Sequence, residues 1–423
     1  MEYSVTAKMS ASGTPRWKLY LAVLLWLIAA VCAVSLFREL PWTTNVYYRD
    51  FTEYYRPSYL LRQHINPYIG TNVGDTPSWL LCVEPLTLLA PFTAYKLWFL
   101  INLMTFAITL ILLFRHSALE EPDKWILAAV MVLYPPIAVN FWQGQSEVFL
   151  LFLLVLFIGE LQRGRDLAAG IILAVASLLR AYPVGLIGYL VARRKWKATA
   201  YTGISCIAGM IVTTAFVGTK VVATYVQNVV GPLPLNQPIE ILRHPTNLSL
   251  SWLVRFVLLN GFGIAEKSRL ASSFAMIAGS IAAAFAFVST WRLDDDSDWR
   301  GFSLWVVTIS ILSPIMWGQF MVCFVIVFVA MAKAHASKRA VGAAVMSYTI
   351  LVLFGDMYGY PINFVPEFAQ LYFAKNTHIL RVLSESVTIS LILLYAACCW
   401  FAFDNKPLPQ SSSDSWRLRH RRS

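Results

Sequence analysis

The apolar stretch LYLAVLLWLIAAVCAVSLF, residues 19–37, is the first of the runs that decide the fold class of this chain. It follows Lys8, Arg16 and Lys18 and is too long for the core of a secretory signal peptide, so we interpret it as a retained membrane span. Runs of roughly 16–22 apolar residues recur along the chain. Inside a bilayer each backbone amide must be satisfied within its own segment, so such runs form helices.

Composition supports this interpretation. The 423 residues are 58% hydrophobic and 13% charged, with a mean hydropathy of +0.60. A soluble domain carries roughly 25% charged residues. The sequence therefore predicts an all-α polytopic membrane protein with about twelve transmembrane helices. We expect them at 19–37, 95–114, 125–140, 145–160, 167–180, 183–192, 199–218, 270–291, 302–314, 319–333, 340–355 and 384–403.

The distribution of Lys and Arg predicts the topology. Short loops such as the one at 193–197 are rich in Lys and Arg, which marks cytoplasmic loops. Residues 79–92 are interrupted by Glu84-Pro85 and Pro91, and we interpret them as a re-entrant or interfacial helix. A full span there would move the basic residues 193–197 outside. The net charge of +11 therefore reflects topology, and no nucleic acid is expected. The basic tail at 416–422 either contacts membrane lipids or is a solvated anchor.

This topology predicts one domain. Residues 1–18 form a cytoplasmic tail, 19–403 the transmembrane domain, and 404–423 a basic cytoplasmic tail. Three long segments, 38–94, 219–269 and 356–383, lie on the outer face, where long loops indicate chemistry. We expect interfacial helices in the first of them. The six cysteines show neither disulfide nor zinc spacing.

The richest candidate stretch is YYRDFTEYYR, residues 47–56. Asp50 and Glu53 share one face of a helix, and a carboxylate among aromatic residues at the membrane surface can act as a general base. Asp50 is our catalytic candidate, with Glu53, Tyr54 and His64 as substrate contacts. An interfacial helix with an Asp–Arg pair and a structural histidine is the alternative.

A second candidate stretch is NFWQGQSE, residues 140–147, between two predicted spans. Gly144 allows a tight turn. Gln145 and Glu147 offer hydrogen-bond partners to sugar hydroxyls. Capping of helix ends is the alternative explanation for these side chains.

Arg180 is the main candidate for binding a phosphate. It lies at the predicted outer end of a helical hairpin, where a membrane-embedded charge is costly and usually functional. A guanidinium suits phosphate recognition, although snorkelling to the interface is an alternative. Arg243 and Arg255 are further phosphate candidates.

Two later stretches add substrate-binding candidates. Asn247 belongs to the triplet Asn247-Leu248-Ser249, which matches a glycosylation sequon or starts a helix. Trp317 and Gln319 lie in a predicted outer turn, where Trp317 either stacks on a sugar ring or belongs to the aromatic belt.

These stretches, in this order, resemble glycosyltransferase family 87 of the type C superfamily, which includes polyprenol-phosphate-mannose-dependent mannosyltransferases and arabinofuranosyltransferases of bacterial envelopes. The resemblance covers about residues 45–333. Its pieces are Asp50-Phe51 with Tyr54-Tyr55, Asn66-Pro67-Tyr68, Gly144-Gln145, Arg163-Gly164-Arg165, Ala169-Gly170, Arg180 with Pro183, Arg193-Arg194-Lys195-Trp196, Asn247-Leu248-Ser249-Leu250 and Ser313-Pro314-Ile315-Met316-Trp317.

The resemblance implies transfer of a hexose, with mannose expected, from a polyprenyl-phosphate donor to a lipid- or glycan-linked acceptor outside the bacterial cytoplasmic membrane. It also implies that Asp50 is the catalytic carboxylate. The family usually has Lys where this chain has Arg180, and Asp or His where it has Gly318-Gln319, a departure that puts Gln319 in doubt. Neither cofactor nor metal is expected, because arginine supplies the counter-charge. An arabinofuranosyltransferase, a polytopic lipid or sugar transporter, and a scaffold are the alternatives.

Overall fold

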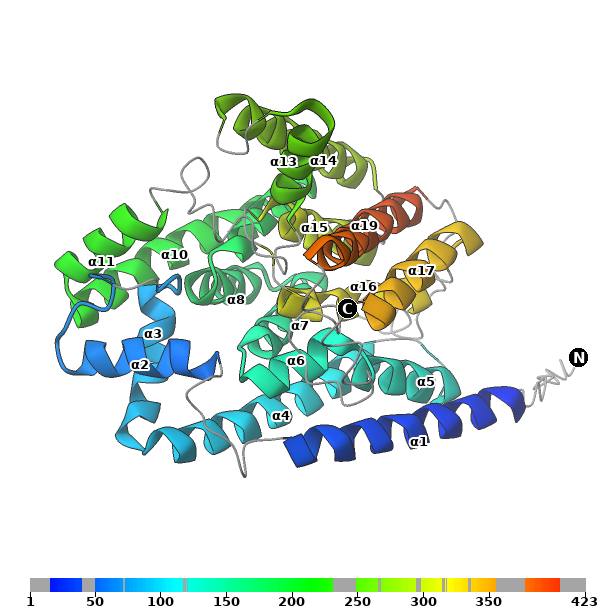
Figure 1. Ribbon diagram of the computed structural model, residues 1–423, viewed down its shortest axis with the longest axis horizontal. Helices are drawn as coiled ribbons and strands as arrows, with labels where there is room; N and C mark the ends of the chain where they lie inside the picture. Colours follow the sequence, from blue (N-terminus) through cyan, green and yellow to red (C-terminus); the bar gives the residue numbers. More distant parts are fainter. Residues whose placement is uncertain are drawn as a thin grey trace, which may run out of the picture.

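The computed structural model describes residues 16–39, 50–70, 73–116, 119, 121–230, 249–264, 268–293, 298–313, 316, 318–333, 336–354 and 377–403. Every regular element in these ranges is a helix, which confirms the predicted all-helical class. The helices gather into an elongated bundle, with the first half of the chain around its lower and left parts in Figure 1 and the later helices mostly around its top and right.

Every predicted span coincides with at least one helix. These helices are α1 (Arg16–Glu39), α4 (Pro91–His116), α5 (Glu121–Val132), α6 (Pro135–Gln143), α7 (Glu147–Gln162), α8 (Asp166–Leu179), α9 (Ile187–Ala192), α10 (Trp196–Val217), α14 (Arg269–Trp291), α15 (Asp298–Leu312), α16 (Val325–Lys333), α17 (Lys338–Phe354) and α19 (Thr377–Ala402). Among the described residues, α4, α10 and α14 are long and apolar enough to cross a membrane, and α5 with α6 makes a fourth candidate. The count of twelve spans therefore remains a prediction.

Some predicted spans are broken helices. The span expected at 125–140 consists of α5 and α6, which meet at an angle of 50°. Pro135 is the first residue of α6, and Pro136 follows it. Proline lacks the N–H that would continue the preceding helix, so the chain bends there. The spans expected at 183–192 and 319–333 begin with the 3₁₀ helices η3 (Tyr182–Leu186) and η6 (Gly318–Phe324).

The first predicted outer segment contains three short helices. They are α2 (Phe51–Arg62), α3 (Pro77–Val83) and the 3₁₀ helix η2 (Glu84–Leu88). Residues 79–92 are therefore not one continuous span, as the interruption by proline predicts. The second outer segment contains α11 (Thr219–Tyr225), the π-helix η4 (Val226–Val230) and α13 (Leu250–Phe262).

Helix α7 lies in the centre of the bundle, against α4, α8 and η6 (Figure 1). Its apolar residues cover all sides of the helix, and Leu150, Leu154, Phe157 and Ile158 are buried. A helix that is apolar all round is stable only inside a protein or a bilayer. Its N-terminus, Glu147, therefore enters the buried interior.

The outer surface of α10 has the opposite character. Ile204, Ile207 and Ile211 follow one another at helical spacing and are 63–65% exposed. Soluble proteins rarely expose continuous apolar surface of this kind. Such a stripe is stable against lipid chains, and it supports the membrane class.

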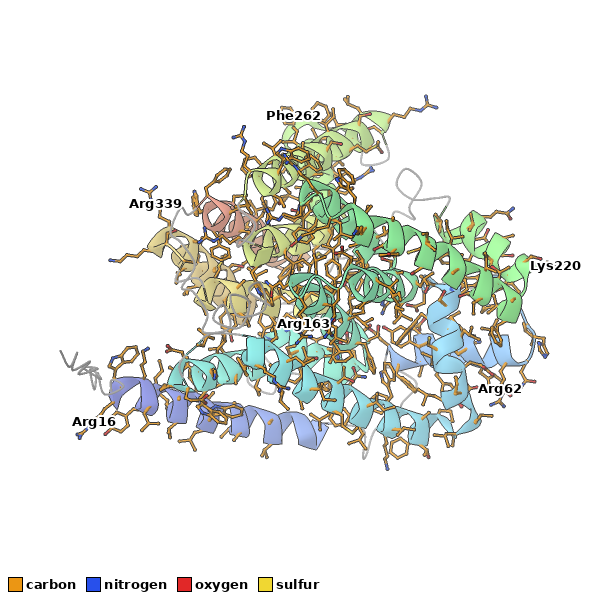
Figure 2. All side chains as sticks on the ribbon, turned by 180° about the vertical axis from the view of Figure 1, so that it is seen from behind. Arg16, Arg62, Arg163, Lys220, Phe262 and Arg339 are labelled. Carbon is orange, nitrogen blue, oxygen red and sulfur yellow. The ribbon has the colours of Figure 1, made fainter. Side chains whose placement is uncertain are left out.

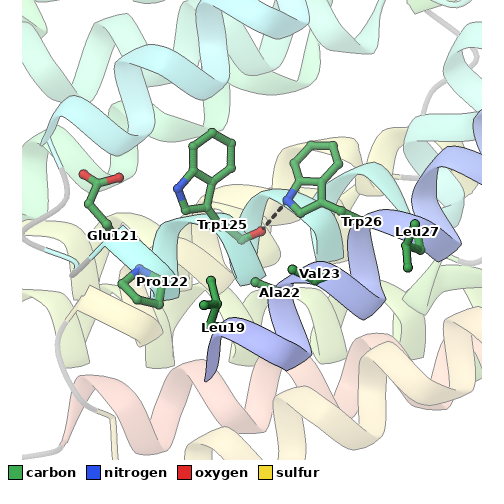
Figure 3. Close-up of a pocket in the computed structure, with 8 residues that line it drawn as sticks. All are labelled: Leu19, Ala22, Val23, Trp26, Leu27, Glu121, Pro122 and Trp125. Carbon is green, nitrogen blue, oxygen red and sulfur yellow. Dashed lines mark hydrogen bonds between the residues drawn. The ribbon is translucent and has the colours of Figure 1, made fainter. Parts of the chain in front are cut away.

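Helix α1 packs along α5, where the two helices enclose an apolar groove of about 560 Å³ (Figure 3). Trp26 donates a hydrogen bond from Nε1 to the carbonyl oxygen of Trp125 at 3.1 Å. Lys18 and Asp123 form an ion pair at 3.0 Å. These contacts attach the first helix to the bundle.

The labelled basic residues do not decide the topology, because Arg163, which is also predicted to be cytoplasmic, lies near the middle of the long axis (Figure 2). Arg16 and Arg339, both predicted to be cytoplasmic, lie at one end of the long axis, while Arg62 and Lys220, both predicted to be outside, lie at the other (Figure 2). Which end faces the cytoplasm remains a prediction.

The close crossing of α8 and α10 generates a stability prediction. A Cβ on Gly170 would lie 2.6 Å from Tyr201 Cβ and 2.9 Å from the Thr202 backbone nitrogen. Gly170→Ala must push the helices apart, and we expect a loss of about 1–3 kcal/mol. The matched control is Gly203→Ala on α10, where a Cβ meets nothing within 4 Å. Thermal unfolding in detergent should rank the variants in this order, and equal melting temperatures would contradict the packing.

Candidate functional site

An aromatic core fixes the first outer segment against the bundle. Phe51 and Tyr54 from α2, Trp79 from α3 and Tyr95 and Trp98 from α4 are all buried. The ring centroids of Tyr54 and Trp79 are 5.6 Å apart in an edge-to-face contact, and those of Phe51 and Tyr95 are 5.5 Å apart. Such pairs add about 0.5–1.5 kcal/mol to the burial of their area. The start of α2 is thereby held rigidly.

Asp50 stands at the N-cap position of α2 but does not cap the helix. Aspartate is a preferred N-cap because its side chain usually accepts a hydrogen bond from the first turn. Here that bond is missing from Asp50, and its Oδ2 accepts a hydrogen bond from Nε2 of Gln145 instead. Burial raises the pKa of this carboxyl above its ordinary value, although the bond from Gln145 opposes the shift. The half-buried carboxylate is thus directed towards the bundle.

The turn between α6 and α7 presents Gln145 to Asp50. Gly144 has a φ of +71°, and a Cβ there would lie 2.8 Å from Tyr95 Cε2 and 3.0 Å from Phe51 Cβ. Glycine is required for both reasons. Trp98 donates from Nε1 to the Gly144 carbonyl at 2.8 Å, and Asn140 Oδ1 accepts from the Glu147 amide at 2.9 Å. This predicted outer turn is confirmed as a turn.

Arg180 follows the last residue of α8 and joins several segments. Its Nη1 contacts Asp75 Oδ1 at 2.5 Å, and its Nη2 donates to the Tyr54 hydroxyl at 2.7 Å and to Ser146 Oγ at 2.8 Å. Its Nε lies 3.2 Å from Glu147 Oε1. The two neighbouring carboxylates more than offset the guanidinium charge.

The predicted residues Asp50, Tyr54, Gln145, Glu147 and Arg180 therefore meet in one cluster, although they come from distant parts of the sequence. We call these five residues, with Asp75 and Ser146, the Arg180 cluster. Tyr182 extends it inwards, because its hydroxyl donates to Glu147 Oε2 at 2.9 Å.

Asp75 was not predicted from the sequence. It is buried, and burial raises the pKa of its carboxyl while Arg180 opposes the shift. The only local signal was an acidic residue at the start of Asp75-Thr76-Pro77, a pattern that begins a helix. Ser146 was missed because a serine next to a turn glycine carries no distinctive pattern.

Other predicted site residues do not join the cluster. Glu53 is exposed on α2, and His64 is exposed at the end of that helix, with a φ of +59°. Arg255 is buried between α13 and α14, where its Nη2 donates to Ser272 Oγ at 2.9 Å. Helix packing accounts for this contact. Three further candidates, Arg243, Asn247 and Trp317, lie outside the described residues, and only the backbone of Gln319 is described.

Metal ligands do not gather in the described ranges, where no group of three or more His, Cys, Asp or Glu residues is arranged to hold an ion. Arg180 provides positive charge beside Asp50.

In the described residues every regular element is a helix, apolar side chains are exposed on the outside, and a polar cluster lies at the start of a buried helix. This is the architecture of a membrane protein with a candidate internal site. The chain matches the family model of glycosyltransferase family 87 over residues 76–315, more than half of its length. It therefore belongs to glycosyltransferase family 87, as the resemblance predicts, and is a membrane glycosyltransferase. A comparison with curated proteins gives no match. The matched range includes Gln145, Glu147 and Arg180, whereas Asp50, Tyr54 and Asp75 precede it.

The Gly144 turn generates a second prediction. Gly144→Ala adds both backbone strain and the contacts with Tyr95 and Phe51, so Asp50 must move. Since a misplacement of about 1 Å can cost about 10²-fold in rate, we expect a large loss of glycosyl transfer. Gly164→Ala is the matched control, because Gly164 has the same φ of +71° and a Cβ there meets nothing within 4 Å.

Both variants should lose about 1–2 kcal/mol from the left-handed backbone alone. Only Gly144→Ala should also lose transferase activity, measured as initial rate per folded protein. Equal activities of the two variants would show that the turn does not position the site.

Proposed function

We propose that this glycosyltransferase moves a hexose, with mannose expected, from a polyprenyl-phosphate donor to a lipid- or glycan-linked acceptor. The reaction takes place on the extracytoplasmic face, with Asp50 as the general base and with inversion at the anomeric carbon. Arabinofuranose is the alternative sugar. The family supplies the enzyme class, and the donor, sugar and roles of individual residues are our proposal.

One observation carries the role of Asp50. Of the three carboxylates in the Arg180 cluster, Asp75 and Glu147 lie within 3.2 Å of the guanidinium, whereas Asp50 has no cation partner among the described residues. Gln145 donates a hydrogen bond from Nε2 to Asp50 Oδ2. Its Oδ1 has no protein donor in the described ranges and can accept a proton from a substrate.

The chemistry follows from that arrangement. The acceptor hydroxyl donates a hydrogen bond to Asp50 Oδ1. As the hydroxyl oxygen attacks the anomeric carbon, Asp50 takes its proton, and the bond between that carbon and the phosphate oxygen breaks. Polyprenyl phosphate leaves with the electron pair. A single displacement inverts the configuration, and general-base assistance contributes about 10²–10⁴-fold.

Arg180 is suited to face the leaving phosphate. Arginine carries five N–H donors. Its Nη1 contacts only Asp75 among the described residues, so one Nη1 hydrogen remains for a phosphate oxygen. A fixed donor aimed at developing charge is a large source of catalysis. Gln145 and Glu147 both lie against the guanidinium and are proposed to meet sugar hydroxyls.

The central test is Asp50→Asn in purified protein supplied with polyprenyl-phosphate mannose and an acceptor glycolipid. The amide cannot accept the proton, so turnover should fall by about 10²–10⁴-fold while donor binding is retained. Product formation is followed by radiolabel transfer, with nucleotide mannose and polyprenyl-phosphate arabinose supplied in parallel. Undiminished turnover in the variant removes Asp50 from the chemistry, and transfer from the nucleotide sugar alone removes the lipid donor.

The rate should also depend on pH in a defined way. Burial, together with Glu53 and Asp75, raises the pKa of Asp50, while Gln145 and Arg180 lower it, and the net shift is upwards. A base must be ionised, so activity is present at high pH and lost as pH falls through this raised pKa. We expect the acid limb of kcat/KM above the ordinary value of about 3.9 for aspartate. An acid limb at or below that value would contradict the assignment.

A further inference from the structure

We infer that Asp75 is a positioning residue for this reaction: it orients the Arg180 guanidinium, which orients Asp50 through Tyr54 and Gln145. The inference rests on the proposed function of Asp50. It assigns a role to a residue that makes no contact with Asp50 and lies before the matched family range.

The first step is that Asp75 is itself fixed on both sides. Its carbonyl oxygen accepts a hydrogen bond from the Tyr68 hydroxyl at 2.8 Å. The next residue, Thr76, donates from Oγ1 to the Leu178 carbonyl at 2.6 Å and accepts from the Trp79 amide at 3.1 Å. The segment is therefore attached both to the end of α8 and to the start of α3.

The second step is that Asp75 selects the orientation of Arg180. The Asp75 carboxylate binds Nη1, so Nη2 donates to Tyr54 and Ser146. Nε donates to Ser146 Oγ at 3.2 Å and lies 3.2 Å from Glu147 Oε1. A guanidinium is a planar fork, and fixing one edge fixes the others. Asp75 and Arg180 are both largely buried, which strengthens their interaction.

The third step is a chain of hydrogen bonds that runs in one direction from Arg180 to Asp50. Arg180 donates to the Tyr54 hydroxyl, Tyr54 donates to Gln145 Oε1, and Gln145 donates from Nε2 to Asp50 Oδ2. Each donor polarises the next bond in such a chain.

The direction of the chain matters for the base. With Arg180 at its head, Gln145 must present its NH₂ group to Asp50. If Arg180 turned away, the Tyr54 hydroxyl could reverse and the Gln145 amide could flip, which would place an oxygen against the carboxylate. Asp75 therefore keeps the amide in the orientation that supports an ionised and correctly placed Asp50.

The experiment is a double-mutant cycle between Asp75→Ala and Tyr54→Phe, each measured as kcat and KM for donor and acceptor. Tyr54→Phe removes the hydroxyl that links Arg180 to Gln145 and leaves only the 3.5 Å approach of Arg180 Nη2 to Gln145 Oε1. If Asp75 acts through this chain, each single variant should lower kcat by about 10–10²-fold with KM within about threefold. The double variant should then be no slower than the slower single variant.

Controls separate this role from stability. Asp123→Asn, which removes a carboxylate from the Lys18 ion pair at the other side of the bundle, should leave kcat unchanged. Asp75→Asn keeps an acceptor oxygen for Nη1, so it should retain more activity than Asp75→Ala. Asp75→Asn can also replace Asp75→Ala in the double-mutant cycle with Tyr54→Phe if the alanine variant fails to fold. Rates are divided by the amount of folded protein.

Three results overturn the inference. They are multiplicative losses in the double variant, no loss in either Asp75 variant, and a loss in Asp75→Asn as complete as that in Asp50→Asn, which would make Asp75 the base. Failure of the proposed function looks different, because Asp50→Asn would then retain full turnover whatever the Asp75 variants do.

Discussion

The ion pair between Arg180 and its two carboxylates is the interaction on which the site depends. Removing a partner from a buried ion pair costs about 3–5 kcal/mol, because the remaining charge stays uncompensated. Asp75 comes from the first outer segment, Glu147 from the start of α7 and Arg180 from the end of α8. The need to neutralise one guanidinium therefore brings three distant segments to a single point.

This constraint also explains why Asp50 differs from its neighbours. Two carboxylates already use the positive charge of Arg180, and a third would add repulsion in a region of low dielectric. Asp50 is instead stabilised by the neutral side-chain amide of Gln145. It also lies at the N-terminus of α2, where the helix dipole favours negative charge. A carboxylate held by dipoles rather than by an ion pair keeps an oxygen for exchange of a proton.

The sequence predicted the helices better than it predicted which side chains contact one another. Apolar runs locate the helices, because each must bury its surface or meet lipid. Arg180 was a candidate because a membrane-embedded charge is costly, Asp50 because a carboxylate among aromatic residues can act as a base, and Gln145 because its amide can meet sugar hydroxyls. Asp75 and Ser146 carry no such signal, since their importance arises only from contacts with residues far along the chain. Arg255 was overrated for the same reason: sequence cannot show that Ser272 lies beside it. The bend between α5 and α6 was signalled by Tyr134-Pro135-Pro136 and was missed because the apolar composition continues across it.

The family match begins at residue 76, immediately after the residue that binds Arg180. Within the matched range, the Gly144 turn provides the Gln145 amide and the end of α8 provides the Arg180 guanidinium. Both groups contact residues of the segment that precedes residue 76. That segment provides Tyr54, Asp75 and Asp50, and aromatic packing on α4 holds it in place. A guanidinium presented by the matched region would be unstable without those upstream carboxylates and hydroxyls. The physical unit of the site is therefore larger than the part of this chain that matches the family model, and its two parts are complementary in charge.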